Sequence, residues 1–130
     1  MLKVSQINTY IKVRFQFAAL HCWPDAPNEV GYLRNLHRHV FHVTATIEVF
    51  HDDRDLEFIL VKNYLQNKVS KALEHKEWPK NVSCEMMATS IAQMIRQRYG
   101  CNRLVCVEVS EDGENGALVE WTADSDVEED

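Results

Sequence analysis

Apolar and polar side chains alternate along the first part of the chain with a period of two, which is typical of half-buried β-strands. Over residues 7–20, Val13, Phe15 and Phe17 fall on one face, and lysine, arginine and glutamine side chains fall on the other. Residues 39–50 are rich in β-branched side chains, which favours a second strand. The pattern therefore predicts two long strands, separated by a long loop over residues 22–35.

The middle of the chain changes to a helical period. Over residues 58–75, apolar side chains recur at steps of three and four, which predicts an amphipathic helix. A second apolar stripe runs from Met87 to Ile95. Ser83 is a suitable N-cap for this second helix, and Gly100 is a natural residue to end it. We therefore expect two helices in succession.

Two further strands are predicted over residues 103–110 and 117–122, joined by a turn over residues 112–116. The resulting order ββααββ places the chain in the α+β class. Residues 1–123 are expected to form a single domain. Residues 124–130 are strongly acidic, and we expect them to be a disordered tail.

Composition and charge argue against nucleic-acid binding and membrane insertion. The chain has 130 residues, of which 45% are hydrophobic and 26% charged, as in ordinary globular domains. Its net charge of −6 argues against nucleic acid as a partner, because phosphate binding needs a basic face. The sequence contains no apolar run of about 20 residues and no signal-peptide pattern, so we expect a cytoplasmic protein that does not enter membranes. The four cysteines have no CxxC spacing and are expected to stay reduced.

Three of the six histidines lie in two short segments, with His21 at the end of the first strand and His37 and His39 at the start of the second. Side chains two residues apart in a strand point to the same face. A third imidazole from the neighbouring strand would complete a three-nitrogen site with one open position, as in catalytic zinc centres. The alternative is that these rings only form hydrogen bonds or face solvent. Arg38 and His42 point the opposite way and are not expected to be ligands.

Several acidic residues and thiols are further candidates. Glu74 beside His75 suits proton transfer, although a histidine in a last helical turn also interacts favourably with the helix dipole. Glu85, in the first turn of the second helix, either compensates that helix dipole or holds a polar ligand group.

Glu108 lies among apolar strand residues, and its carboxylate is either exposed or pairs with two adjacent N–H donors of a ligand. Cys84 stands in a first helical turn, where a thiol pKa can be lowered, and Cys22 directly follows His21. The alternative, which holds for most cysteines, is that each thiol is a small buried side chain.

Several of these segments, taken in order, resemble motifs of the 6-pyruvoyltetrahydropterin synthase family, which includes the bacterial 6-carboxytetrahydropterin synthases of queuosine biosynthesis. The family motif F-x-A-x-H is similar to the segment that ends at His21, and its L-H-G-H is similar to Leu36-His37-Arg38-His39. Further similarities lie at Glu57 to Lys62 (D-F-x-x-L-K), Leu73 to Trp78 (L-D-H-x-x-L), Val82 to Glu85 (P-T-S/T-E) and Glu108-Val109 (E-T).

The resemblance implies the T-fold, in which an antiparallel sheet carries two helices on one face and subunits assemble into a barrel, commonly a hexamer of two trimers. It implies zinc on His21, His37 and His39. It further implies a pterin substrate, 7,8-dihydroneopterin triphosphate in the family, anchored by Glu108 at a subunit interface with help from Glu85. His75 with Glu74 resembles the family's proton-relay pair.

The chain departs from the family pattern at the catalytic thiol. The family's catalytic cysteine position is Leu33 here, and Cys22 is the only cysteine of the loop. Arg38 replaces the glycine of L-H-G-H, and Glu74 replaces the relay aspartate. Two hypotheses follow: a zinc-dependent lyase acting on a dihydropterin with Cys22, Glu74 and His75 as catalytic candidates, or a T-fold protein that binds a pterin, purine or nucleotide without turnover.

Overall fold

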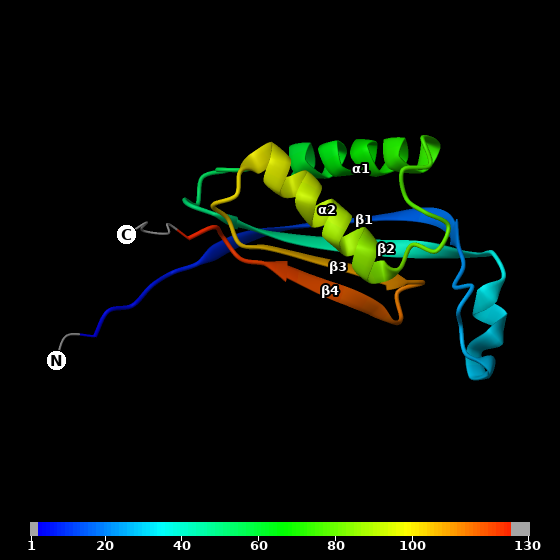
Figure 1. The fold of residues 1–130 in the computed structure, drawn as a ribbon. Helices are drawn as coiled ribbons and strands as arrows, with labels where there is room; N and C mark the ends of the chain where they lie inside the picture. The colour runs from blue at the N-terminus through cyan, green and yellow to red at the C-terminus, as the bar shows by residue number, and fades with distance from the viewer. Residues whose placement is uncertain (1–2, 126–130) are drawn as a thin grey trace, which may run out of the picture.

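Figure 1 shows one antiparallel sheet with two helices packed on one of its faces. This computed structural model describes residues 3–125. The elements are β1 (Thr9–His21), the 3-10 helix η1 (Asn28–Arg34), β2 (His37–Val49), α1 (Phe58–Glu74), α2 (Cys84–Tyr99), β3 (Val105–Glu111) and β4 (Gly116–Trp121). The strands lie in the order β1-β2-β3-β4, each antiparallel to the next. The predicted ββααββ order and the α+β T-fold are confirmed.

Strand alternation decides which residues form the core. Odd-numbered positions of all four strands point toward the helices, and the core side chains of β2 and β3 include Phe41, Val43, Ala45, Ile47, Val105, Val107 and Val109. Val61, Leu65 and Val69 of α1 and Met87, Ile91 and Ile95 of α2 meet this face from above. Even-numbered positions form an open face without a helix. No helix in residues 3–125 is both long and apolar enough to span a bilayer.

Local signals set the ends of the elements. The Ser83 hydroxyl accepts a hydrogen bond from the Met86 amide at 3.1 Å and thus caps α2, as predicted. Gly100 ends the helix with φ of 102°. β2 starts at His37, two residues earlier than predicted, and extends the pairing with β1 as far as His21 opposite His37.

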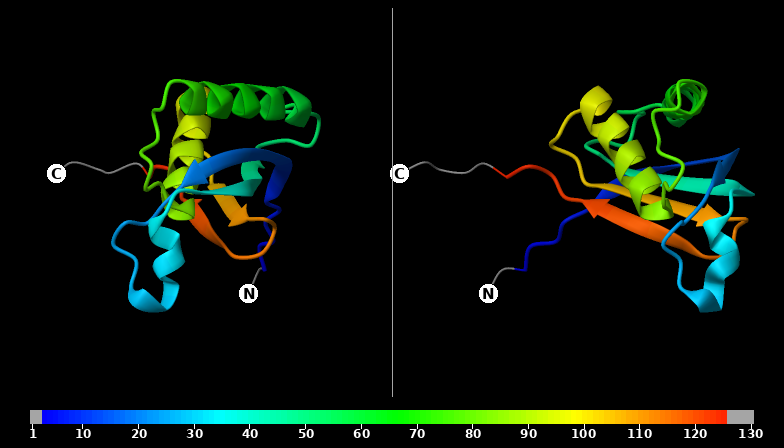
Figure 2. Two further views of the ribbon diagram at one scale, coloured as in Figure 1. Left: turned by 90° about the vertical axis from the view of Figure 1, so that its right-hand side faces the viewer. Right: turned by 45° about the vertical axis from the view of Figure 1, so that its right-hand side comes forward.

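The predicted loop over residues 22–35 contains η1, which the sequence pattern did not reveal. Arg34 holds this segment together, because its guanidinium donates to the Ala26 carbonyl and to the Asn28 side chain, both at 2.8 Å. The Trp23 amide also donates to the Leu33 carbonyl at 2.7 Å, which closes the base of the segment. η1 projects from the end of the sheet at which β1 ends and β2 begins (Figures 1 and 2).

The β3–β4 hairpin turns at this same end of the sheet. A side chain at Gly116, the first residue of β4, would place its Cβ 2.3 Å from the Val109 carbonyl oxygen, so only glycine fits here. The last residue of β1, the start of α2 and this hairpin turn thus all lie at the same end of the sheet (Figure 1).

Two buried arginines anchor the opposite end. Arg103 donates to the Asp55 carboxylate at 2.9 Å and to backbone carbonyls, and so fixes the β2–α1 connection. Arg96 donates to the Asp124 carboxylate at 2.8 Å, so the chain beyond β4 lies against α2 as far as this residue. The predicted acidic tail begins at Asp124, and its residues 126–130 lie outside the described part of the chain.

Candidate metal centre

The three predicted histidines lie together where β1 ends and β2 begins, at the end of the sheet next to η1. His21 pairs directly with His37, and His39 lies two positions further along β2 on the same face. Their ring centroids are 4.6 to 5.3 Å apart, and one nitrogen from each ring lies within 4.8 Å of the others. We call these residues the histidine trio.

Every ring of the histidine trio is oriented by a hydrogen bond from its Nδ1 atom. The acceptors are the Val82 carbonyl for His21 (2.9 Å), the Asn35 carbonyl for His37 (2.8 Å) and the Asp112 carboxylate for His39 (2.6 Å). Carbonyl and ionised carboxylate oxygens only accept, so each Nδ1 carries the proton. In the neutral form of each ring, Nε2 then keeps the lone pair with which an imidazole binds a metal ion.

The surroundings of the three Nε2 atoms show whether they could bind a metal ion. Those of His37 and His39 are buried and have no hydrogen-bond partner among the described residues. A carboxylate oxygen of Glu111 lies 3.2 Å from His21 Nε2, and its other oxygen lies 3.5 Å from His39 Nε2. Lone pairs facing one another and a carboxylate repel unless a cation lies between them. The donor set therefore fits a bound metal ion.

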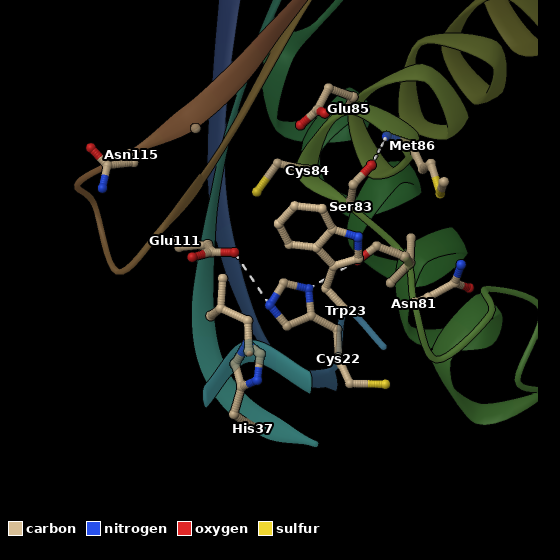
Figure 3. A pocket seen from close by; sticks show the side chains of 14 residues that line it. Cys22, Trp23, His37, Asn81, Ser83, Cys84, Glu85, Met86, Glu111 and Asn115 are labelled. Carbon is tan, nitrogen blue, oxygen red and sulfur yellow. Dashed lines mark hydrogen bonds and ion pairs between the residues drawn. The ribbon is translucent and has the colours of Figure 1, made fainter. Parts of the chain in front are cut away.

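A pocket of about 570 Å³ opens beside the histidine trio (Figure 3). His21 and His37 form one end of it. Cys22, Trp23 and Leu33 contribute from the β1–β2 connection. Residues 81–86 contribute from the end of the α1–α2 connection and the first turn of α2, and Glu111, Asn115 and Gly116 from the β3–β4 hairpin. The volume falls within the range of small-molecule sites, roughly 300–1,000 Å³.

Glu111 supplies the pocket carboxylate that lies beside the histidine trio, and sequence reasoning missed it. The predicted acid, Glu108, is exposed on the open face between Thr44 and Leu118 and does not line the pocket. The difference follows from strand alternation, because Glu111 shares odd parity with the buried Val107 and Val109 whereas Glu108 does not. That parity was readable in the sequence and would have indicated Glu111.

Glu74 and His75 lie away from the histidine trio in this chain. They stand at the C-terminal end of α1, where His75 is the C-cap residue, and both side chains are exposed. Neither lines the pocket. Their role as a proton-relay pair stays a prediction.

Both candidate thiols line the pocket, but their environments differ. Burial, followed by the neighbouring carboxylates of Glu111 and Glu85, raises the pKa of the Cys84 thiol to about 11. A first helical turn can lower a thiol pKa, but here desolvation and two negative charges outweigh the helix dipole. Cys22 is half-buried. Glu85 lines the pocket from the first turn of α2.

Asp112 directly follows β3 and contacts both His39 and the backbone of Val40. The Val40 amide donates to its carboxylate at 2.9 Å. This hydrogen bond, followed by that from His39, holds the pKa of Asp112 below its usual value. The carboxylate is therefore ionised at neutral pH.

A four-stranded antiparallel sheet, two helices on one face and a histidine trio able to hold a metal ion together define an α+β domain of the T-fold class. The model of the 6-pyruvoyl tetrahydropterin synthase family matches residues 10–121, so the chain belongs to this family. A comparison with curated proteins found no match. Family membership supports a tetrahydropterin synthase-like function in general terms.

Proposed function

We propose that the chain is a zinc-dependent carbon–oxygen lyase of the 6-pyruvoyltetrahydropterin synthase type, acting on 7,8-dihydroneopterin triphosphate or a related dihydropterin. The observation that carries the proposal is the convergence of nitrogen atoms from three imidazoles beside a pocket that is also lined by carboxylates. Three neutral imidazoles with a fourth position open to water or substrate are the ligand set of catalytic zinc.

The pocket suits a flat heterocycle with adjacent N–H groups. A carboxylate accepts two parallel hydrogen bonds from such an edge, and Glu111 is the pocket carboxylate that lies beside the Nε2 atoms of His21 and His39. We therefore propose Glu111, in place of Glu108, as the pterin anchor, with Glu85 as a second acceptor at the start of α2. The indole of Trp23 lines the same pocket and is half-exposed, so it offers an aromatic surface for stacking.

The reaction would divide between the metal and the side chains. Zinc, when bound, would polarise the oxygen-bearing side chain of the substrate as a Lewis acid. Glu111 would hold the ring so that this side chain lies toward the histidine trio. Cys22 is the half-buried thiol of the pocket and is our candidate for moving a proton. Glu74 and His75 are exposed at the end of α1, so their relay role requires a site shared with another copy.

The edges of the sheet support assembly into a ring. β1 and β4 are both edge strands, and β4 of one copy beside β1 of another continues the antiparallel alternation. The strand registers place Lys12 and Glu120 in one row across the open face, at opposite edges. Head-to-tail pairing would bring these opposite charges together. We propose a closed homo-oligomer, a trimer or a hexamer.

A second candidate function is supported by the pocket thiols. Leu33 occupies the position of the family's catalytic cysteine and lines the pocket, and the Cys84 thiol is held protonated by its surroundings. Loss of a general base typically costs about 10²–10⁴-fold in rate. A chain without a working base would bind a pterin, purine or nucleotide and release it unchanged.

Metal analysis combined with turnover assays separates the two candidates. We expect one zinc ion per chain and conversion of dihydroneopterin triphosphate, and mass spectrometry of the product distinguishes the 6-pyruvoyl from the 6-carboxy type. A Cys22→Ala variant should lose turnover and keep its ligand affinity. Stoichiometric zinc and tight pterin binding without turnover would instead establish the binding protein. A protein that takes up no metal would exclude the proposal.

A further inference from the structure

Asp112 forms hydrogen bonds with two neighbouring residues of β2. One oxygen of its carboxylate accepts the His39 Nδ1–H at 2.6 Å, and the other accepts the Val40 amide at 2.9 Å. Its own amide donates to the Val40 carbonyl at 2.7 Å. The residue adopts φ of 54°, a left-handed conformation that aspartate and asparagine tolerate better than most residues. The backbone of the β3–β4 turn is therefore shaped to present this carboxylate to His39.

The histidine trio is asymmetric in this respect. His21 and His37 donate to neutral backbone carbonyls, whereas His39 donates to a charged carboxylate. A carboxylate behind a ligating imidazole fixes its tautomer and orientation and makes its other nitrogen a stronger donor to the metal. Asp112 also adds a second negative charge near the site, on the far side of His39 from Glu111.

We propose that Asp112 is a positioning residue of the metal centre: it holds His39 as the Nδ1–H tautomer and strengthens Nε2 as a ligand. The inference rests on the proposed metal-binding function of the histidine trio. It adds a residue of the β3–β4 turn to a site whose predicted ligands all come from β1 and β2. It also makes His39 the ligand whose bond to the metal is tuned by charge.

An Asp112→Asn variant isolates the charge. Asparagine keeps the size of the side chain and adopts φ of 54° readily, and its amide oxygen can still accept one hydrogen bond. Zinc affinity, measured by competition with a chromophoric chelator, should fall about 10–100-fold. Asp112→Ala should lose more zinc affinity, because it removes the hydrogen bond that orients the His39 ring as well as the charge. The matched control is Glu114→Gln, which removes one charge from the same exposed turn and should leave affinity unchanged.

The His39 tautomer gives a readout that a merely structural role would not move. In metal-free protein, ¹⁵N NMR should find His39 as Nδ1–H in the wild type and a mixture of tautomers in Asp112→Ala, with His21 and His37 unchanged. Equal zinc affinity for wild type and Asp112→Asn, or an unaltered His39 tautomer in Asp112→Ala, would overturn the inference. A wild-type protein that binds no zinc would refute the proposed function instead, and the NMR measurement would still decide the role of Asp112.

Discussion

At the scale of single residues, the proposed anchor Glu111 is the pocket carboxylate beside the histidine trio. Its carboxylate faces the Nε2 atoms of His21 and His39 and lies on the same wall as Asn115 and Gly116. Hydrogen bonds to charged groups contribute about 1.5–3 kcal/mol each. Removing this charge should therefore weaken binding of a ligand that presents N–H donors.

Glu111→Gln should lower the affinity for a dihydropterin by roughly 10–100-fold, as measured by calorimetry on the zinc-loaded protein. Glu108→Gln is the matched variant, since it makes the same change three residues away on the open face. It should leave the affinity unchanged. Weakened binding in Glu108→Gln together with normal binding in Glu111→Gln would reinstate Glu108 as the anchor.

Cys84 should react slowly with alkylating reagents. Because its pKa is raised to about 11, roughly one thiol in several thousand is ionised at pH 7.5, and the thiolate is the reactive form. Iodoacetamide at this pH should label the exposed Cys101 and spare Cys84, as read by peptide mass spectrometry. The Cys84 rate should then rise about tenfold per pH unit up to about pH 11. Labelling of Cys84 at the rate of Cys101 would contradict this assignment.

The histidine trio could be predicted because the alternation of side chains in a strand is a local rule. His37 and His39 share a face whatever the rest of the fold does, and the structure brings His21 to them. The groups that accept hydrogen bonds from the histidine trio could not be predicted. Val82 and Asp112 reach the trio from parts of the chain about 60 and 70 residues away, through contacts that only tertiary folding creates.

At the scale of elements, the helices and strands followed their hydrophobic periods, whereas η1 escaped prediction. Its seven residues are too few to display a helical stripe, and none of them is buried. The contacts of Arg34 hold the segment instead, and a side chain that binds its own loop leaves no periodic signal. The element that carries Leu33 to the pocket is therefore the one least visible in the sequence.

The β2–α1 connection depends on the ion pair between Asp55 and Arg103, whose charged atoms lie 2.9 Å apart. Both side chains are largely buried. The hydrogen bond from Arg103, followed by that from the Phe50 amide, lowers the pKa of Asp55. A carboxyl whose pKa is lower in the folded state stabilises the protein above its unfolded pKa of about 3.9, and this stability is lost as the pH falls through the folded value.

Asp55→Asn should therefore lower the free energy of unfolding by about 2 kcal/mol at pH 7, and the difference from wild type should shrink steadily below about pH 4. Urea denaturation at several pH values measures this effect. Asp53→Asn is the control, because Asp53 pairs with Arg54 at the exposed surface and should matter little at any pH. A pH-independent loss in Asp55→Asn would show that the ionised pair is not the cause.

At the scale of the whole molecule, the open face of the sheet is divided by charge. Lys12 and Arg14 lie on the edge strand β1, whereas Glu120 lies on the opposite edge strand β4 and Glu108 on β3 beside it. Head-to-tail assembly would therefore pair unlike charges at each junction, whereas joining two β1 edges would pair like charges. This asymmetry favours a closed ring over an isologous dimer.

Replacing both Lys12 and Arg14 by Glu should shift the protein from three or six chains toward smaller species, as measured by light scattering. The reason is repulsion with Glu120 across the proposed junction. The same charge change at Lys68 and Lys71, both exposed on α1, should leave the mass unchanged. An unchanged mass in the Lys12 and Arg14 variant, or a monomeric wild type, would contradict head-to-tail pairing through these edges.

The direction of the outer strands has a practical consequence. β1 runs toward the histidine trio and β4 runs away from it, so the chain enters and leaves the domain at the end remote from the pocket (Figure 1). A purification tag or a surface linker can therefore be fused to either terminus without obstructing ligand entry. Immobilised protein should present the mouth of the cavity to the solution.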